Sequence, residues 1–454
     1  MNFNTTNPAT GKSLQHYTEM NEQTAFSIIE ETDHAFSQYK TTTFTQRREW
    51  LTHLHRLLNQ QIEIFAKLMT QEMGKPITQS RAEIKKCLLL IEHYIEHGEN
   101  YLKPQTIKSS ANHSYICYQP IGVIFGIMPW NFPLWQAMRF AVPTLMAGNT
   151  VLFKHAPIST GCAFAIEALF KEAFGIANCF RTVVVSNDVA SAIIHHAKIK
   201  AVSLTGSGRA GKSVAMNAGS ALKKVVLELG GSDPYVILED ADLDAAANAC
   251  VFARLLNAGQ VCIAAKRIIV VKTVMAEFLS YLKSHLQNYQ MGDPMDEATT
   301  LGPIAREDLR DKVHEQVLAS IQQGAILELG GVIPEREGFY YPVTMLTNIK
   351  PGMVAFEEEI FGPVFAIVEA DDEQHAIALA NQTEYGLTAA VFTKDIVRGE
   401  MIARDSLNAG CVAVNRFVAT EPALPFGGIN QSGFGRELGE SGIKAFVNEK
   451  TVVI

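Results

Sequence analysis

Strand-like and helix-like segments alternate over the middle of the chain. Four apolar runs are separated by segments whose apolar residues recur at helical spacing, and these runs are VIFGIM, TVLFKHAP, AVSLTGS and KVVLELGG. Such alternation is typical of a parallel sheet with helices on its faces. It therefore predicts an α/β fold whose ligand-binding loops lie at the carboxyl ends of the strands.

A second series of the same kind begins after Asp233. The run YVILED, a helical segment from Leu243, the run RIIVV and a helical segment from Met275 follow one another. A chain of 454 residues is too long for one hydrophobic core. We therefore predict two α/β domains that divide near Gly231, with long amphipathic helices over residues 24–75.

The composition argues against several classes of function. The formal net charge of −8 gives no basic surface for nucleic acid or anionic lipid. No apolar run is long enough to cross a bilayer, and the polar start MNFNTTNPATG lacks the layout of a signal peptide. The seven cysteines form no C-x-x-C pair and show no zinc spacing. We expect a cytoplasmic protein with no nucleic-acid or membrane partner, no disulfide framework and no metal.

Three residues have the side chains that a covalent thiol mechanism needs. Cys262 ends NAGQVC, where Gly259 and Gln260 leave room for close backbone approach, and a thiolate is a good nucleophile. Asn131 in PWNFP can donate to a tetrahedral oxyanion. Glu228 follows the apolar strand VVL and can activate water as a general base.

Each of these residues also has an ordinary interpretation. Taken alone, Cys262 is more often a buried thiol, Asn131 a turn former and Glu228 a solvated acid. Their combination in one chain favours catalysis.

A dinucleotide site is predicted where SLTGSGRAG ends a strand and opens a helix. Amide groups at a helix N-terminus can face a pyrophosphate, although this spacing differs from the usual dinucleotide fingerprint. Glu359 in EEIFGPV can hold a ribose, although a glutamate cluster is more often a solvated face. The candidate cofactor contacts are Trp130, Lys154, Pro157, Gly206, Ser207, Gly211, Glu359 and Phe361.

Taken together, six motifs in order resemble the aldehyde dehydrogenase superfamily over nearly the whole chain. They are PWNFP, SLTGSGRAG, LELGG, GQVC, EEIFGPV and PFGGINQSGFGRELG. The resemblance implies NAD(P)-dependent oxidation of an aldehyde to an acid through a thiohemiacetal and thioester on Cys262. Asn131 would be the oxyanion donor and Glu228 the base, while Lys154, Ser207, Glu359 and Phe361 would contact the dinucleotide.

The resemblance also implies a division of the chain. A Rossmann-type cofactor domain would comprise residues 1–101 and 121–230, and an α/β catalytic domain residues 231–439. Residues 102–120 and 440–454 would form an oligomerisation element that joins subunits into a homodimer or homotetramer.

Closer inspection shows similarity to bacterial succinate-semialdehyde dehydrogenases of the shorter type. Arg139, eight residues after Asn131, falls where such enzymes carry an arginine for the substrate carboxylate. A buried arginine among apolar residues needs a partner, which could equally be a protein carboxylate. The arginine that some members carry six residues before the nucleophile is Leu256 here, and the nearest arginine is Arg254. Another small aldehyde therefore remains an alternative substrate.

The resemblance bears on the cofactor and on competing reactions. In relatives that prefer NAD, the residue three after the lysine is often a glutamate that repels a 2′-phosphate, and here it is Pro157. We therefore expect both NAD and NADP to work. An acylating relative that transfers the acyl group to coenzyme A or phosphate would not need Glu228 as a base. A non-catalytic structural protein on this fold would not need Cys262, Asn131 and Glu228.

Overall fold

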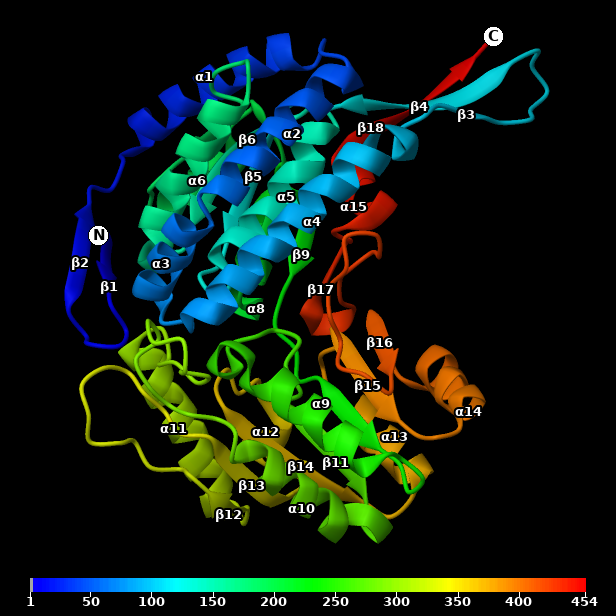
Figure 1. Ribbon diagram of the computed structural model, residues 1–454. Coiled ribbons are helices and arrows are strands. Elements are labelled where there is room, and N and C mark those ends of the chain that lie inside the picture. Colours follow the sequence, from blue (N-terminus) through cyan, green and yellow to red (C-terminus); the bar gives the residue numbers. More distant parts are fainter. Residues whose placement is uncertain (1–2) are drawn as a thin grey trace.

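Two α/β units lie one above the other in the computed structural model, which describes residues 3–454 (Figure 1). The first unit contains a six-stranded sheet of order β17-β9-β8-β5-β6-β7, parallel except for β17. The predicted alternation of strands and helices is confirmed. The strands are β5 (Val123–Met128), β6 (Thr150–His155), β7 (Phe180–Thr182), β8 (Ile199–Thr205), β9 (Lys224–Glu228) and β17 (Gly433–Phe434).

Helices cover both faces of this sheet, because its strands are apolar on both sides. One face packs on α1, α7 and α8 through Ile29, Ile193 and Val214. The other face packs on α2 to α6, of which α5 is buried along its whole length. The helices are α1 (Glu22–Tyr39), α2 (Phe44–Gln60), α3 (Ile62–Met73), α4 (Ile77–Tyr101), α5 (Pro133–Met146), α6 (Thr160–Ala173), α7 (Asn187–His195) and α8 (Gly208–Ser220).

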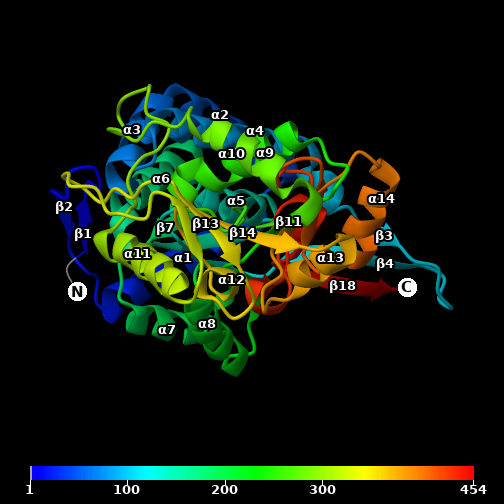
Figure 2. The ribbon, with the colours of Figure 1, turned by 90° about the horizontal axis from the view of Figure 1, so that it is seen from below.

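The second unit contains a seven-stranded sheet of order β12-β13-β14-β11-β10-β15-β16, in which only the edge strand β12 is antiparallel to its neighbour. Helices α9 and α10 lie on one face, and α11 and α13 on the other (Figure 2). The strands are β10 (Pro234–Ile237), β11 (Arg267–Val271), β12 (Ile326–Leu329), β13 (Thr344–Ile349), β14 (Val364–Ala370), β15 (Thr388–Phe392) and β16 (Cys411–Val414). The helices are α9 (Leu243–Leu255), α10 (Met275–Leu286), α11 (Glu307–Gln322), α12 (Val354–Glu357), α13 (Glu373–Asn381) and α14 (Ile396–Met401).

A three-stranded arm projects from the first unit (Figure 1). Its strands are β3 (Gln105–Thr106), β4 (Ser114–Pro120) and β18 (Val447–Val453), which follows the short helix α15 (Gly439–Lys444). β18 pairs with β4 from Val447 opposite Pro120 to Val453 opposite Ser114. A separate hairpin of β1 (Phe3–Thr6) and β2 (Ser13–Tyr17) lies at the other end of the unit.

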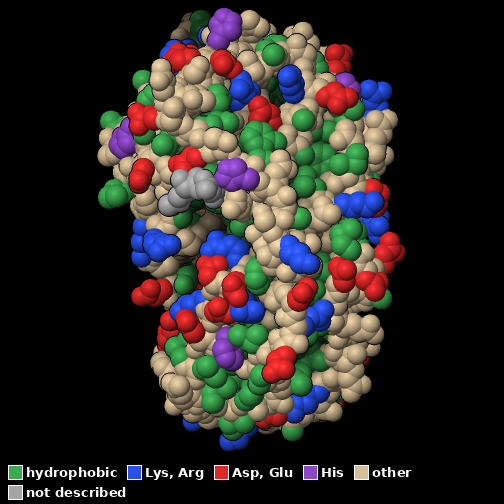
Figure 3. Space-filling model, turned by 90° about the vertical axis from the view of Figure 1, so that its left-hand side faces the viewer, with side chains coloured by type: hydrophobic (Ala, Val, Ile, Leu, Met, Phe, Trp, Pro, Cys, Tyr) green, Lys and Arg blue, Asp and Glu red, His purple; other side chains and the backbone are tan. Residues whose placement is uncertain are grey.

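The surface carries charges of both signs. Acidic and basic side chains are interspersed over the face in Figure 3, in keeping with the small net charge of −8. Among residues 3–454, no helix has both the length and the apolar character that crossing a bilayer requires.

The strand order fixes where a ligand can bind. From β5 the chain proceeds outward to β6 and β7 and then returns to β8 on the other side of β5. Loops after two such neighbouring strands diverge and leave a crevice at their carboxyl ends. Asn131 follows β5, Gly206 follows β8 and Glu228 ends β9. The amino ends of strands in the second sheet face this crevice, because Cys262 precedes β11 and Glu359 precedes β14.

Candidate active site

Two cavities meet at Cys262. The first, of about 250 Å³, lies at the crevice of the first sheet, and the second, of about 240 Å³, lies between α4, α5 and α9. Cys262 and Gln136 line both. A thiol in this position is accessible to one molecule from each side.

The loop before Cys262 has a strained backbone. Asn257 and Ala258 adopt left-handed conformations with φ of 52° and 53°, which cost roughly 1–3 kcal/mol each for residues with a Cβ. Gly259 also has a positive φ, and a Cβ there would lie 2.2 Å from the carbonyl oxygen of Gly362. Glycine at 259 therefore allows the Cys262 loop to pack directly on the segment that carries Glu359.

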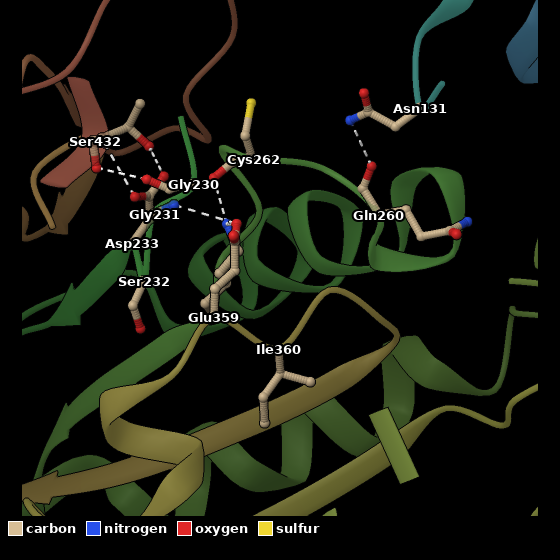
Figure 4. A network of polar contacts seen from close by, with 12 residues as sticks. Asn131, Gly230, Gly231, Ser232, Asp233, Gln260, Cys262, Glu359, Ile360 and Ser432 are labelled. Carbon is tan, nitrogen blue, oxygen red and sulfur yellow. Dashed lines mark hydrogen bonds and ion pairs between the residues drawn. The ribbon is translucent and has the colours of Figure 1, made fainter. Parts of the chain in front are cut away.

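Hydrogen bonds hold this strained loop against the Asn131 loop. Asn131 Nδ2 donates to the Gln260 carbonyl over 2.9 Å (Figure 4). Asn257 Nδ2 donates to the Asn131 carbonyl over 2.8 Å. The Gln260 side chain donates to the Asn257 carbonyl over 3.0 Å and accepts from the Ala305 amide over 2.9 Å. Among residues 3–454 the Asn131 amide group donates this one hydrogen bond, which leaves its second hydrogen free, and Asn131 and Cys262 line the same cavity.

The Cys262 side chain is surrounded by groups that affect its ionisation. Its sulfur points away from Glu359 (Figure 4), while its carbonyl accepts a hydrogen bond from Lys266. Burial raises the pKa of Cys262 to about 11, against the opposing charges of Lys266 and Arg139. A base must therefore remove the thiol proton at neutral pH.

Glu228 lies buried at the end of β9, facing the first cavity. Burial and the neighbouring Glu437 carboxylate raise its pKa well above the usual value, and neither of its oxygens has a hydrogen-bond partner among residues 3–454. Gly427 provides the space, because a Cβ there would lie 2.6 Å from Glu228 Oε1. Ser432 fixes the turn that follows by donating to the Gly230 carbonyl over 2.7 Å.

The first cavity contains five of the eight predicted cofactor contacts. They are Trp130, Gly206, Ser207, Glu359 and Phe361. The Trp130 and Phe361 rings meet edge to face with centroids 5.8 Å apart. Ser207 is the N-cap of α8, and its hydroxyl accepts from the Ala210 amide over 3.3 Å. Glu359 is 3.1 Å from Lys266 Nζ and accepts from the Gly231 amide over 3.2 Å.

The other three predicted cofactor contacts do not line this cavity. Lys154 is buried at the end of β6 and forms no ion pair with any of residues 3–454, and burial lowers its pKa to about 8. Pro157 opens the short 3-10 helix Pro157–Ser159 two residues after β6. Gly211 serves packing, because a Cβ there would lie 2.5 Å from the Leu229 side chain.

Arg139 finds its partner within the chain. It lies on α5 with 2% of its surface exposed, and its guanidinium forms an ion pair with Glu437 and donates to Thr205 over 3.3 Å. Of the two partners that the sequence left open for a buried Arg139, the protein carboxylate is present, and a contact of Arg139 with the substrate stays a prediction. Arg139 still lines the second cavity, as does Leu256.

Three residues that position the site carry no sequence signal of that role: Asn257, Lys75 and Glu83. Gln260 was noted in the sequence for the room beside Cys262, but not for the hydrogen bonds of its side chain. In the structure Lys75 and Glu83 form a buried ion pair. Glu83 also accepts from the first amides of α5, at Leu134 over 2.9 Å and Trp135 over 2.8 Å, and thereby fixes the helix that follows Asn131.

Comparison with known proteins agrees with the fold and gives the family. The model of the aldehyde dehydrogenase family matches residues 1–452. The chain is 44% identical to the succinate semialdehyde dehydrogenase [NAD(P)+] Sad of Escherichia coli (strain K12), covering 98% of this chain and 96% of that protein. It is 42% identical to a probable succinate-semialdehyde dehydrogenase [NADP(+)] of Synechocystis, covering 99% of each.

A solved structure gives the same result. The succinic semialdehyde dehydrogenase from Streptococcus pyogenes, in complex with NADP+, superimposes with a TM-score of 0.97 at 33% identity, covering 99% of each chain. The family model spans almost every residue and the fold agrees over the full length. The chain belongs to the aldehyde dehydrogenase family.

Proposed function

We propose that this enzyme oxidises succinate semialdehyde to succinate with NAD+ or NADP+. The observation that carries the proposal is the position of Cys262 between two cavities, one lined by predicted cofactor contacts and Glu228, the other by apolar and cationic side chains. The relatives named above act on succinate semialdehyde with NAD(P)+ or NADP+ according to their names. Membership of the family and the position of Cys262 between the two cavities both support oxidation of an aldehyde by this mechanism.

The residues of the first cavity fit a dinucleotide. Gly206 and Gly208 leave space at the N-terminus of α8, and a Cβ at Gly208 would meet nothing within 4 Å. The amides of that first turn favour a pyrophosphate. Glu359 is held at the cavity wall for a ribose hydroxyl, beside Phe361. When bound, the nicotinamide accepts the hydride that the aldehyde carbon loses.

The chain's own groups supply the remaining steps. Glu228 removes the thiol proton, and the Cys262 thiolate attacks the carbonyl carbon to form a thiohemiacetal. The free amide hydrogen of Asn131 stabilises the developing oxyanion. After hydride loss a thioester remains on Cys262. Glu228 releases to solvent the proton that it took from the thiol. It then removes a proton from water, whose oxygen displaces the thiolate and releases the acid.

The second cavity supports a substrate with a distal carboxylate. Its apolar wall includes Phe252 and Phe417, and its charged residues are Glu83, Lys86 and Arg139. Glu83 is neutralised by Lys75, so the remaining field inside the cavity is positive. A four-carbon aldehyde with a terminal carboxylate matches this combination.

A direct assay tests the proposal. Reduced cofactor formation at 340 nm is compared for succinate semialdehyde and butanal, each with NAD+ and with NADP+. We expect kcat/KM for succinate semialdehyde to exceed that for butanal by at least tenfold, with both cofactors active. A preference for butanal contradicts the substrate, and no reduction with any pair contradicts the enzyme assignment.

We also propose that subunits assemble into a homodimer or homotetramer through the β3-β4-β18 arm. The arm projects from the body and leaves most of β18 exposed, including Val453 at 62%. A cytoplasmic location is proposed because all seven cysteines are free, as is usual in a reducing compartment.

A further inference from the structure

Lys86 is a cation without a counter-ion in the wall of the second cavity. It lies on α4 and forms no ion pair with any of residues 3–454. Its ammonium donates to the Thr420 hydroxyl and lies 4.3 Å from the centre of the Trp135 ring. The Thr420 hydroxyl and the Trp135 ring orient the Lys86 ammonium, but neither carries a negative charge that would balance it.

The other charges of this cavity are already satisfied. One oxygen of Glu83 accepts from the amides of Leu134 and Trp135, and the other pairs with Lys75. The guanidinium of Arg139 pairs with Glu437. Lys86 is therefore the cationic side chain of this cavity that keeps its charge free for an incoming anion.

Burial makes the unpaired positive charge of Lys86 energetically unfavourable. Burial and, to a smaller extent, the positive charge of Arg139 lower the pKa of Lys86 to about 8, while Cys87, Glu83 and Cys262 oppose the shift. A buried ammonium gains most from a ligand that brings a negative charge and hydrogen-bond acceptors. Lys86 and Cys262 line the same cavity, so such a ligand can reach the thiol with its other end.

We propose that Lys86, with Thr420 beside it, binds the distal carboxylate of the substrate and sets the preference for carboxylated aldehydes. This rests on the proposed oxidation of succinate semialdehyde. The ammonium donates to one carboxylate oxygen while the aldehyde carbon lies over Cys262. The apolar wall around Leu256 and Phe417 contacts the methylene groups between them.

The test compares Lys86→Met with Lys86→Arg and with the matched control Lys85→Met, which removes an exposed charge from the neighbouring position of α4. In Lys86→Met we expect KM for succinate semialdehyde to rise about 10- to 100-fold with a small change in kcat, and KM for butanal to rise far less. Lys86→Arg should recover most of the loss, and Lys85→Met should match the wild type.

A binding measurement gives a second readout that does not depend on turnover. Succinate should raise the thermal unfolding midpoint of the wild type but not of Lys86→Met, and Lys86→Gln serves if the methionine variant does not fold. Equal loss with both aldehydes, or no loss with either, overturns the assignment while leaving the reaction intact. A wild type that prefers butanal instead overturns the substrate itself, and the role of Lys86 with it.

Discussion

Burial weakens both acids on which the proposed chemistry depends. The pKa of Cys262 rises to about 11, and that of Glu228 rises well above its usual value. A raised pKa makes the Glu228 carboxylate a stronger base than a solvent-exposed one, which favours its proposed removal of the thiol proton. The sequence predicted these residues from their types and motifs, but their ionisation depends on Glu437 and Arg139, which lie far from both in the chain.

The first residue-scale prediction concerns the base. Glu228→Gln should leave a slower burst of reduced cofactor and then slow turnover about 100-fold or more, because the thiol loses its proposed base and water is no longer activated to hydrolyse the thioester. Stopped-flow absorbance at 340 nm separates the two phases. Cys262→Ala is the control that removes the burst as well. Unchanged steady-state turnover in Glu228→Gln would assign the base elsewhere.

The second prediction follows from the pKa of Cys262. Below about pH 11 the thiolate fraction rises with pH, so alkylation of Cys262 in the free enzyme should accelerate about tenfold per pH unit from pH 7 to 10. Peptide mass spectrometry after iodoacetamide treatment distinguishes Cys262 from the half-buried Cys117 and Cys411. A plateau near pH 8 would contradict a raised pKa.

The third prediction concerns Arg139. Arg139→Ala leaves Glu437 buried without its partner, which typically costs about 3–5 kcal/mol. We expect a lower thermal unfolding midpoint and a loss of activity with succinate semialdehyde and butanal alike. A selective loss with succinate semialdehyde would show that Arg139 binds the substrate in spite of its ion pair.

Elements with strong local patterns were predictable, and those defined by distant partners were not. The helix predicted from Leu243 is α9 (Leu243–Leu255), because its apolar spacing and its Asp242 cap are both local. β17 has two residues and exists only because Gly433 pairs with Glu228 across the chain. The sequence after Cys179, FRTVVV, is apolar enough for a longer strand, but only Phe180–Thr182 pair with β6.

The strained nucleophile loop gives an element-scale prediction. Gln260→Ala removes the hydrogen bonds to Asn257 and Ala305 and leaves their buried polar groups unpaired. This should lower the free energy of unfolding by about 1–3 kcal/mol. The burst rate should fall about tenfold as the Cys262 loop relaxes, together with the unfolding midpoint. Gln322→Ala, on the exposed side of α11, is the control. An unaltered burst rate would show that the loop holds its conformation without Gln260.

On the scale of the molecule, the site belongs to neither unit alone. Carboxyl ends of the first sheet supply Asn131 and Glu228, and amino ends of the second supply Cys262 and Glu359. The alternation of elements predicted both sheets, but which ends face each other depends on how the units pack. The ion pair of Arg139 and Glu437 was hidden for the same reason, since the two residues are brought together only by the complete fold.

The proposed assembly gives a prediction at this scale. Deleting residues 449–454 removes most of the pairing between β18 and β4, and light scattering after size exclusion should then report a smaller oligomer than the wild type. Deleting Ile454 alone is the control. An oligomer of unchanged mass, or a monomeric wild type, would contradict assembly through the arm.

The late return of the chain to the first sheet determines when the enzyme becomes active during its synthesis. Until Gly433 emerges, β9 is an open sheet edge and Glu228 lacks the wall that buries it. Ribosomes add about 5–20 residues per second, so roughly 10 to 40 s separate the translation of Glu228 from that of Gly433. A nascent chain thus holds most of its first unit before the surroundings of Glu228 are complete, and a product truncated before Gly433 would fold in part but leave the proposed base exposed.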